Sequence, residues 1–476
     1  MVNDHVAIIL AAGEGKRMRP YTNNTSKCLL KVGNKRLIEH IVDACEEAGI
    51  KDIVVVVGYQ KKRVKRLLGN RVKYVVNKKY HSTQTMYSLW LTRKIADGRP
   101  LIQINGDTYF HPLILKKLIG HAYPDAMAVD LNAKLDEEAT KVIVQGGRVR
   151  MIGKELPIRA ADGECLGIRK YSARTASKLY KEIGKSIRRG GAQKYIFEVL
   201  NNFLRVNRFD AVQTDGLPWT EIDFEKDLVK ARKINSMPIV LIFAAGVGRR
   251  ILPLTSDMPK ALLRIGGKTL IERQIELFKR AGLNDIVVIV GHKKNAVKRL
   301  LGNSVRHVEN PLYKTTQTMY SLWQTRKFVF GRPLIIVMGD LLFDEKLLSK
   351  LLKSKKPDCA IVDCNVLITP ETVKVKIKNN KVLYIDIRNI AINEAIGEYI
   401  GLNKLSVNGS KLLFKICEKI IEKSPHWKLA HIPFNVFVKY RPFYAIYAEG
   451  EVWAEIDFEK DYSNAKKMRG KWELKQ

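Results

Sequence analysis

Acidic residues are scarce in this 476-residue sequence. It has 48 aspartates and glutamates against 84 lysines and arginines, which gives a net charge of +36. A surplus of this size calls for an anionic partner, either nucleic acid or a phosphorylated small molecule, or for an unusual solvent history. The basic residues are spread over the whole chain, apart from small clusters such as Lys61–Arg66 and Lys353–Lys356. Specific nucleic-acid binding is therefore the less favoured interpretation, and the salt dependence of filter binding would test it.

Cysteine is also scarce, with six residues and no C-x-x-C pair among them. The two halves of the chain, whose repetition is described below, do not share cysteine positions: Cys28 corresponds to Ala261 and Cys45 to Phe278. A disulfide framework or a zinc site of the repeated unit would have been duplicated with it. The sequence therefore predicts reduced, structural thiols.

Long apolar runs are missing as well. The longest, such as Val6–Ala12 and Pro238–Gly246, fall far short of the ~20 residues that span a bilayer. Val6–Ala12 also lacks the basic leader and the small-residue cleavage site of a signal peptide, and its pattern returns in mid-chain. We therefore interpret it as a β-strand and expect a cytoplasmic protein without a membrane span.

An internal repeat determines the architecture. Residues 82–94 read STQTMYSLWLTRK and residues 315–327 read TTQTMYSLWQTRK, so eleven of these thirteen positions are identical. Gly13 corresponds in the same register to Gly246, and Asp107 to Asp340. A repeated unit that fills half the chain is a duplicated domain, because solenoid repeats are only about 20–50 residues long.

The two copies are predicted to span residues 1–234 and 238–476. The spacing between matching positions is constant from Gly13 to Asp107, but it is longer by one at Gly167, which matches Gly401. The second copy therefore carries one extra residue somewhere after the position of Val149. Two such copies in one chain suit a monomer that is an internal pseudo-dimer.

Apolar patterns alternate between strands and helices within each copy. The first copy predicts strands at Val6–Leu10, Ile53–Val57, Val72–Val76 and Leu101–Ile104, and helices at Leu37–Ala48, Lys61–Leu68 and Met86–Arg93. This alternation is typical of an α/β fold, here two tandem doubly wound, mostly parallel-sheet (Rossmann-like) domains. In such sheets, ligands bind beyond the carboxyl ends of the strands.

The first strand of each copy runs directly into a loop of small residues, which let backbone N–H groups approach phosphate oxygens. The residues that we expect to bind a nucleotide there are Ala11, Ala12, Gly13 and Gly15 in the first copy and Ala244, Ala245, Gly246 and Gly248 in the second. Arg17 and Arg250 follow and add a charged fork suited to the β- and γ-phosphates.

Two better-known phosphate loops are excluded. The G-x-x-x-x-G-K-[ST] pattern is absent, and Met18 and Ile251 stand where the dinucleotide fingerprint needs its third glycine. A G-x-G pair alone is equally compatible with a tight strand–helix turn. The continuation favours phosphate binding, because Lys27 and Lys260 stand ten residues past the arginines, from where each can fold back onto the α-phosphate.

The whole pattern, A-A-G-x-G-x-R-[MIL]-x-P followed by K-x-L-L, resembles the nucleotidyltransferases that activate sugar phosphates and alcohol phosphates. Three further segments are most similar to the phosphocholine cytidylyltransferase branch, which includes enzymes acting on 2-aminoethylphosphonate. They are MYSLW, the G-E-x-[LI]-G-[IL] phrase at 163–168 and 397–402, and W-[TA]-E-I-D at 219–223 and 453–457. The resemblance covers essentially the whole chain, twice.

Two aspartates recur at matching places in each copy. Asp107 and Asp340 follow an apolar strand, while Asp223 and Asp457 end the late W-[TA]-E-I-D phrase. A single aspartate after a strand is commonly a turn or cap residue. The resemblance assigns all four to a metal, Mg²⁺ (or Mn²⁺), which prefers carboxylates, waters and substrate phosphates as ligands. Lys27, Arg17, Lys260 and Arg250 are the catalytic residues that the same resemblance implies.

The nucleobase and the acceptor are assigned by position. Gln84, Thr85, Gln317 and Thr318 lie where related enzymes contact a pyrimidine, although a polar cap opening the next helix is an equal alternative. Trp219 and Trp453 could face a cationic acceptor. The acceptor residues implied by the resemblance are Lys154, Glu164, Trp219 and Glu221 in the first copy and Arg388, Glu398, Trp453 and Glu455 in the second. Arg388 is the nearest equivalent of Lys154, where the copies diverge.

The implied reaction transfers CMP from CTP to an alcohol phosphate or phosphonate, such as phosphocholine, phosphoethanolamine or 2-aminoethylphosphonate, and releases pyrophosphate. Two alternatives stay open. One is a sugar- or polyol-1-phosphate acceptor, and the other is a nucleotide-sensing or scaffold protein with one or both copies inactive. Neither copy has lost the lysine or an aspartate, which favours two working sites.

Overall fold

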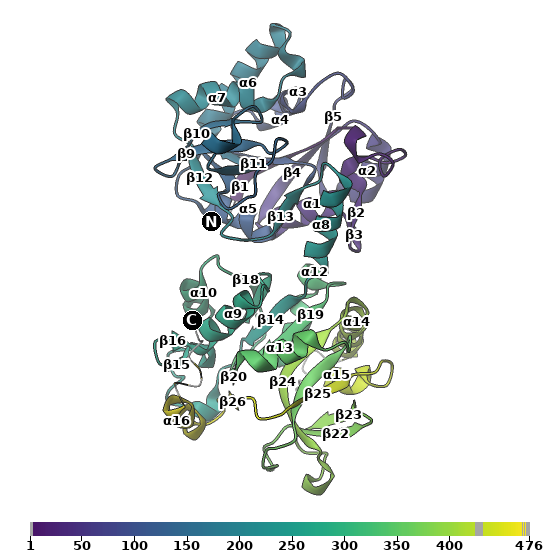
Figure 1. Cartoon of the computed structure of the whole chain (residues 1–476), viewed down its shortest axis with the longest axis vertical. Helices are drawn as coiled ribbons and strands as arrows, with labels where there is room; N and C mark the ends of the chain where they lie inside the picture. Colours follow the sequence, from purple (N-terminus) through teal and green to yellow (C-terminus); the bar gives the residue numbers. More distant parts are fainter. Residues whose placement is uncertain (1–2, 424–431, 469, 471, 473–476) are drawn as a thin grey trace. The chain divides into compact units, whose positions relative to one another are not determined.

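The computed structural model describes residues 3–423, 432–468, 470 and 472 of the chain. Two units are formed, residues 1–235 and residues 236–476, and each has its own nine-stranded sheet (Figure 1). Among the described helices, none combines the length and the apolar character needed to cross a bilayer.

The sheet of the first unit is parallel on one side and mixed on the other. Its order is β5-β4-β1-β6-β11-β8-β12-β10-β9. The strands are β1 (Asn3–Ala11), β4 (Ile50–Val57), β5 (Lys73–Val76), β6 (Leu101–Asn105), β8 (Ala126–Asp130), β9 (Lys141–Gln145), β10 (Arg148–Gly153), β11 (Gly163–Tyr171) and β12 (Asp210–Gln213). β5, β4, β1 and β6 are parallel, whereas β11 is antiparallel to both β6 and β8.

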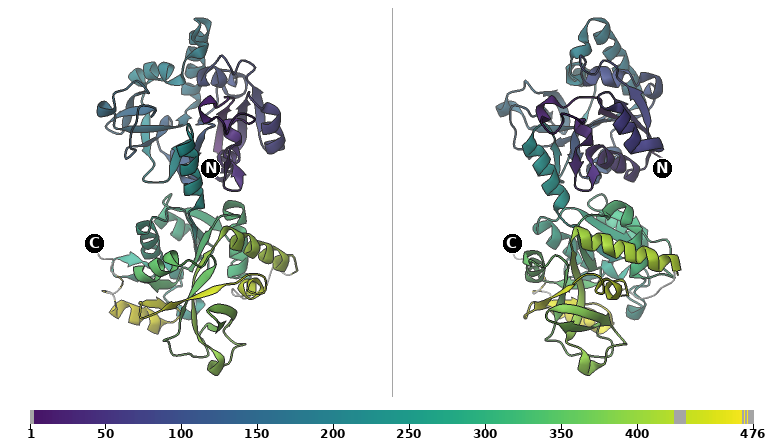
Figure 2. Two further views of the ribbon diagram at one scale, coloured as in Figure 1. Left: turned by 45° about the vertical axis from the view of Figure 1, so that its right-hand side comes forward. Right: turned by 90° about the vertical axis from the view of Figure 1, so that its right-hand side faces the viewer.

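Helices cover both faces of this sheet (Figure 2). One face packs against α1 (Leu37–Glu47), α2 (Lys61–Leu68), α5 (Pro112–Gly120) and α8 (Glu225–Ser236). The other packs against α3 (Thr85–Trp90), α4 (Arg93–Ala96), α6 (Ala173–Arg188) and α7 (Ile196–Val206). A separate ribbon pairs β7 (Thr108–Phe110) with β13 (Trp219–Glu221), and β2 (Lys31–Val32) pairs with β3 (Lys35–Arg36). The β7–β13 ribbon brings the two predicted metal segments together.

The second unit repeats this topology, with the order β18-β17-β14-β19-β24-β21-β25-β23-β22. Its strands are β14 (Ile239–Ala244), β17 (Ile286–Val290), β18 (Arg306–Glu309), β19 (Leu334–Met338), β21 (Cys359–Asp363), β22 (Lys374–Lys378), β23 (Lys381–Asp386), β24 (Gly397–Leu405) and β25 (Tyr444–Ala448), with the short pairs β15 (Arg264–Ile265) and β16 (Lys268–Thr269), β20 (Leu341–Phe343) and β26 (Trp453–Glu455). Its helices are α9 (Leu270–Arg280), α10 (Lys294–Leu301), α11 (Thr318–Gln324), α12 (Arg326–Val329), α13 (Glu345–Lys353), α14 (Val407–Lys423), α15 (Ile432–Phe437) and α16 (Glu459–Lys467).

The predicted α/β, Rossmann-like class is confirmed, and two details differ from the prediction. The sheet is mixed because β11 runs antiparallel to β6 and β8, and because β9 and β10 form a hairpin, which pairs antiparallel strands without a crossover helix. The hairpin turn needs two residues with positive φ, supplied by Gly146 and Gly147 in the first unit and by Asn379 and Asn380 in the second. The helix predicted over residues 86–93 ends at Trp90 instead, close to where the buried Thr92 hydroxyl donates to the Leu89 carbonyl.

All six cysteines are free thiols, as predicted, and five of them are buried. Cys364 alone is exposed.

Candidate functional site

The glycine loop packs closely against Lys27 at its second glycine and leaves open space at its first glycine. Gly15 has φ 70°, and a Cβ built on it would lie 2.8 Å from Cβ of Lys27. A Cβ on Gly13 would meet nothing within 4 Å. Gly248 and Gly246 repeat this arrangement in the second unit. The loop therefore has space for a ligand at its first glycine, where backbone N–H groups could approach phosphate.

A cavity lies beside this loop in each unit. In the first unit its volume is about 660 Å³, and the predicted residues that line it are Gly13, Gly15, Arg17, Lys27, Gln84, Thr85, Asp107, Lys154, Glu221 and Asp223. In the second unit it is about 470 Å³, and they are Ala244, Ala245, Gly246, Gly248, Lys260, Gln317, Thr318 and Asp340. Both volumes are in the range of small-molecule sites. Ala11 and Ala12 are buried at the end of β1 and do not line the first cavity.

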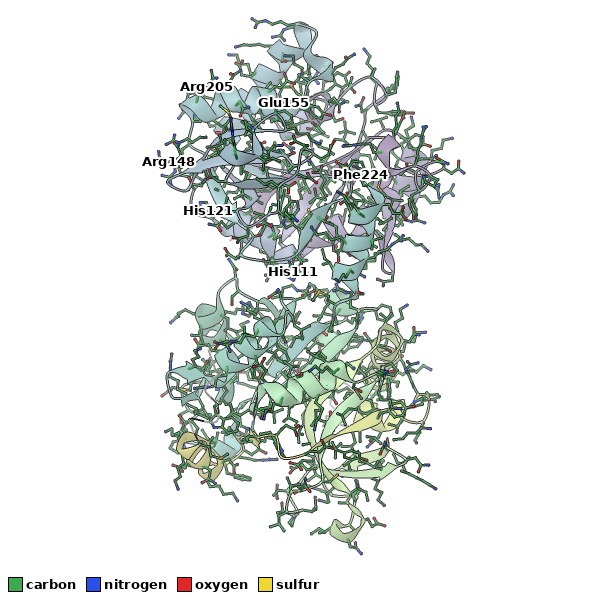
Figure 3. All side chains as sticks on the ribbon, in the orientation of Figure 1. His111, His121, Arg148, Glu155, Arg205 and Phe224 are labelled. Carbon is green, nitrogen blue, oxygen red and sulfur yellow. The ribbon has the colours of Figure 1, made fainter. Side chains whose placement is uncertain are left out.

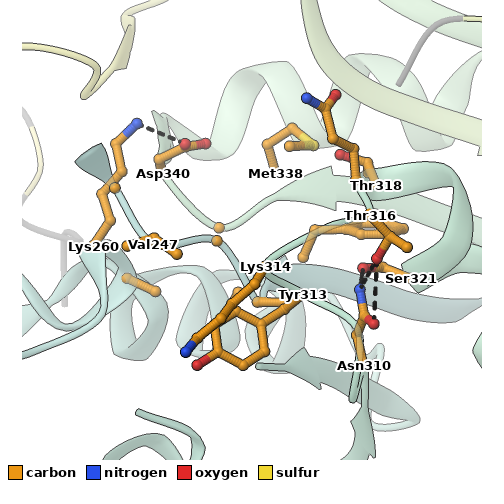
Figure 4. A pocket seen from close by; sticks show the side chains of 18 of the residues that line it. Val247, Lys260, Asn310, Tyr313, Lys314, Thr316, Thr318, Ser321, Met338 and Asp340 are labelled. Atoms are coloured by element: carbon orange, nitrogen blue, oxygen red, sulfur yellow. Dashed lines mark hydrogen bonds and ion pairs between the residues drawn. The ribbon is translucent and has the colours of Figure 1, made fainter. Parts of the chain in front are cut away.

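The two ends of the second cavity differ in chemistry (Figure 4). At one end, Nζ of Lys260 lies 2.8 Å from a carboxylate oxygen of Asp340. At the other, the Asn310 amide donates to the hydroxyls of Thr316 and Ser321, at 3.1 and 2.9 Å. This hydrogen-bonded turn precedes Gln317 and fixes the entry to α11.

The first unit has the same turn, in which the Asn77 amide donates to Thr83 and Ser88 at 3.0 and 3.1 Å. Sequence reasoning missed this asparagine, although its identity in both copies was a usable signal. Gln84 and Gln317 stand directly before their helices, yet neither side chain makes a capping hydrogen bond. Both are exposed and line their cavities, so their amides are available to a ligand.

An ammonium group that is largely shielded from water lies between two aspartates in each unit, with side-chain exposures of 16% for Lys27 and 12% for Lys260. Nζ of Lys27 is 2.7 Å from Asp107 and 2.7 Å from Asp223. Nζ of Lys260 is likewise 2.8 Å from Asp340 and 2.5 Å from its second aspartate, Asp457. Burial alone would lower the pKa of Lys27, but the carboxylates of Asp107 and Asp223 outweigh it and hold the pKa above its ordinary value. Each lysine is therefore a fixed positive charge at the edge of the cavity.

Glu221 joins this cluster, although the sequence suggested an acceptor role for it. Carboxylate oxygens of Asp107, Glu221 and Asp223 lie within 4.8 Å of one another, as do those of Asp340, Glu455 and Asp457. Burial, and then the neighbouring carboxylates, raise the pKa of Glu221 to about 8. The pKa of Glu221 is raised because three carboxyl groups lie close together and share a single ammonium group.

The carboxylate cluster fits a divalent cation. One oxygen each of Asp107 and Asp340 is buried and has no hydrogen-bond partner within the part of the chain that the structure describes. Unpartnered buried carboxylate oxygens are costly unless a cation or donor satisfies them. Hard oxygen donors at this spacing are what Mg²⁺ and Mn²⁺ prefer.

The two loop arginines are turned toward carboxylates. Arg17 donates to Glu138 at 2.5 Å and pairs with Asp223 at 2.9 Å. Its guanidinium lies 5.5 Å from the ring centre of Phe224, which is marked in Figure 3. Arg250 pairs with Asp457 at 2.8 Å and does not line the second cavity. Contact with the β- and γ-phosphates stays a prediction that requires these ion pairs to exchange.

The structure divides the predicted acceptor residues between two cavities of the first unit. Lys154 and Glu221 line the cavity beside the glycine loop. Trp219 and Glu164 line a neighbouring cavity of about 520 Å³, and both cavities share Glu221 and Asp223. Trp219 is only 8% exposed, and its indole N–H donates to Asp130 at 2.8 Å. Its ring therefore belongs largely to the core.

In the second unit the acceptor prediction needs a correction. The backbone carbonyl of Lys154 accepts from the Lys141 ammonium, and the carbonyl of Ile387 accepts from Lys374 in the same way. Ile387, not Arg388, is therefore the counterpart of Lys154. Arg388 is exposed, and the second cavity is lined by none of Arg388, Glu398, Trp453, Glu455 and Asp457 in the described part of the chain.

A buried lysine that the sequence did not single out binds the main chain around Lys154, one of the predicted acceptor residues. Lys141 is 0% exposed, and its ammonium donates to the carbonyls of Asp136, Glu137, Ala139 and Lys154 at 2.7–3.4 Å. Lys374 makes the corresponding bonds in the second unit. A lysine as the first residue of two corresponding strands was the signal available in the sequence.

We expect Lys141→Met to lower the free energy of unfolding by about 2–4 kcal/mol, because the carbonyls would lose a charged donor. Urea unfolding of the full chain measures the change, with Lys178→Met on the exposed face of α6 as the matched control. Lys374→Met should behave like Lys141→Met. Equal free energies of unfolding for Lys141→Met and Lys178→Met would contradict a stabilising role for these Lys141 hydrogen bonds, which we call the buried clamp.

A pH effect is expected from a glutamate that recurs in both units. Burial and the nearby Asp136 raise the pKa of Glu164 to about 7, and burial and Asp363 raise the pKa of Glu398 to about 7. A folded-state pKa above the ordinary 4.5 means that the stabilisation is present at low pH and is lost as the pH rises through about 7.

The double variant Glu164→Gln/Glu398→Gln should therefore lose less stability than the wild type between pH 5 and pH 8, by on the order of 1 kcal/mol per site. Urea unfolding at each pH gives the comparison. Glu155→Gln, at an exposed position marked in Figure 3, is the control and should follow the wild type. Parallel pH profiles for all three proteins would contradict the assignment.

Comparison with known proteins is consistent with this geometry. The family model described as MobA-like NTP transferase domain matches residues 7–177 and again residues 240–368. The two matches fall on the two units, so the duplication holds at the level of the family as well.

Three curated relatives illustrate the likeness. Bifunctional protein GlmU of Symbiobacterium thermophilum is 35% identical over 137 residues, which is 28% of this chain and 28% of that protein. CTP:phosphoglutamine cytidylyltransferase of Campylobacter jejuni is 26% identical over 246 residues, 46% of this chain and 96% of that protein. Choline-phosphate cytidylyltransferase of Streptococcus pneumoniae is 45% identical over 91 residues, 18% of this chain and 39% of that protein. The chain thus spans well under two thirds of the first and third of these relatives.

Proposed function

Because the chain belongs to the MobA-like NTP transferase family through both of its units, we propose that each unit transfers a nucleotidyl group, releasing pyrophosphate. The donor we propose is CTP, and the acceptor is an alcohol phosphate or a phosphonate of the phosphocholine, phosphoethanolamine or 2-aminoethylphosphonate type. The observation that carries this proposal is the duplicated cluster of one lysine and two aspartates beside an open glycine loop.

The relatives support CTP as the donor, since two of the three are named for cytidylyl transfer. In this chain, the amides of Gln84 and Gln317 line the cavities without a capping role and could bond the edge of a base. An amide offers both a donor and an acceptor, which suits the edge of cytosine.

The chemistry needs no general base, because the attacking phosphate or phosphonate oxygen is already anionic at neutral pH. The work of the protein is to position the two substrates and to neutralise charge at the α-phosphate. Lys27 and Lys260 are placed to do so, because each ammonium is largely shielded from water, charged and at the cavity wall. Arg17 and Arg250 would bind the departing pyrophosphate after leaving their carboxylate partners.

A divalent cation held by Asp107 and Asp223, and by Asp340 and Asp457, would supply further charge neutralisation when bound. Glu221 and Glu455 lie close enough to join these pairs. Because the aspartates would serve as ligands of that cation, each lysine would be free of its present ion pairs to face the α-phosphate.

A pyrophosphate-release matrix tests the proposal. The full chain is assayed with four NTPs against phosphocholine, phosphoethanolamine, 2-aminoethylphosphonate, sugar 1-phosphates and a polyol 1-phosphate, alone and with Lys27→Ala or Lys260→Ala. Turnover confined to CTP and the first three acceptors is the expected result. Turnover with sugar or polyol 1-phosphates would instead support that class of acceptor, and no turnover anywhere would support a nucleotide-sensing or scaffold role.

A further inference from the structure

One buried cation of the first unit makes no ion pair among the described residues, and the acidic side chain that acts on it most strongly, from farther away, is Glu221. Arg169, on β11, is 2% exposed and lines the cavity beside the glycine loop. Its Nε and Nη1 make no hydrogen bond within the described residues, and Nη2 lies 3.6 Å from the sulfur of Cys165. A guanidinium carries its charge at every physiological pH, so burying it without an anion is costly. Such a group is best explained by a ligand that supplies the anion.

The second unit lacks this buried arginine. Asn403 replaces Arg169, and Tyr399 replaces Cys165, in the register that aligns Gly401 with Gly167. The Tyr399 hydroxyl donates to the Asn403 side chain at 2.8 Å, so the two polar groups satisfy each other. The second unit therefore has an uncharged, hydrogen-bonded pair at the position where the first unit has a cation.

The charge difference does not concern the reacting groups, because both units carry the same lysine and aspartates. Lys154 is another cation that lines the first cavity and has no counterpart in the second, and it is already paired with Glu138 at 3.2 Å. Within the described residues, Arg169 is left as the cation without an ion pair that differs between the cavities, because Glu221 acts on it only at a distance and already faces Lys27. Its anion must therefore belong to a part of the ligand that only the first unit binds.

On the basis of the proposed nucleotidyl transfer, we propose that the first unit takes an acceptor with a carboxylate in addition to its attacking phosphate or phosphonate, and that Arg169 binds this carboxylate. The second unit takes an acceptor without one. A planar carboxylate matches the donor fork of a guanidinium, and its single charge matches the single charge of Arg169. A second phosphate dianion would bring more negative charge than this one cation offsets.

Two pairs of acceptors test the inference, since the members of each pair differ only by a carboxylate. They are O-phosphoserine with O-phosphoethanolamine, and 2-amino-3-phosphonopropionate with 2-aminoethylphosphonate. With CTP and the Lys260→Ala full chain, in which only the first unit works, kcat/KM should be about 10–100-fold higher for the carboxylated member of a pair. In Arg169→Asn, the kcat/KM ratio of the carboxylated to the uncarboxylated acceptor should fall to within about threefold. The change should appear as a higher KM for the carboxylated acceptor.

The complementary variant and the controls use the same assay. Cys165→Tyr/Arg169→Asn recreates the bonded pair of the second unit and keeps the test open if Arg169→Asn folds poorly. Arg150→Asn, an exposed arginine of β10, should keep the wild-type preference. In the Lys27→Ala chain, where only the second unit works, the uncarboxylated member should be preferred.

The outcomes separate this inference from the function on which it rests. Turnover without a carboxylate preference, or an Arg169→Asn defect that is equal for both members of a pair, would overturn the role of Arg169 and leave nucleotidyl transfer standing. Absence of pyrophosphate with every acceptor and NTP would overturn the proposed function itself.

Discussion

Replacing Lys27 and Lys260 together by alanine is expected to abolish pyrophosphate release, with a loss of at least about 10³-fold at each site. Each ammonium is largely shielded from water and pairs with two aspartates at the wall of its cavity. Without the lysine, the negative charge that develops at the α-phosphate would face the carboxylates with no ammonium to offset it. Steady-state pyrophosphate release, measured for the double variant and both single variants, gives the result.

The single variants make this prediction sharper, because each leaves one unit intact. Lys27→Ala should retain the activity of the second unit, and Lys260→Ala that of the first. Lys178→Ala is the matched control, since this exposed lysine of α6 lines neither cavity. Near-normal turnover in the double variant, with the fold confirmed by circular dichroism, would overturn the proposed chemistry.

Activity is also expected to depend on a divalent cation and on Asp107 and Asp340. Asp107→Asn/Asp340→Asn should lose about 10²–10³-fold in kcat/KM, because an amide oxygen is a weaker, uncharged ligand. Chelation of divalent ions should abolish wild-type turnover, and Mg²⁺ or Mn²⁺ should restore it. Calorimetric titration with Mg²⁺ and CTP measures the same site without turnover.

The control for this variant is Asp215→Asn, on an exposed turn with φ 50°, a conformation that asparagine tolerates. It should show wild-type turnover and wild-type Mg²⁺ titration. A wild-type protein that is fully active in chelator, or an Asp107→Asn/Asp340→Asn variant that titrates normally with Mg²⁺, would remove these aspartates from the cation site.

The sequence predicted that the glycine loop and the lysine of each unit lie together, because local signals define this part of the site. A short apolar strand, a loop of small residues and a lysine at a fixed spacing must lie close together once the first strand is in the sheet. Gly15 and Lys27 accordingly touch in the structure. The return of the whole pattern in the second half of the chain removed the ambiguity of a single G-x-G pair.

The acceptor side was harder to predict, because its residues meet only through tertiary structure. Glu221 was expected at the acceptor, but β13 pairs with β7 and places it against Asp107. The one-residue insertion concealed which residue of the second copy matches Lys154. Arg169 looked like an ordinary basic residue of a strand, and the indication for Lys141 was its return as Lys374 in the second copy.

The buried clamp of Lys141 and Lys374 has a consequence for how the two units could diverge after duplication. The ammonium binds main-chain carbonyls, so the bonds it makes do not depend on which side chains the clamped segment carries. Lys154 in one unit and Ile387 in the other are held by the same carbonyl bond. Mutation could therefore change the residues that face an acceptor without changing the path of the chain, and one copy could acquire a new specificity while its twin kept the old one.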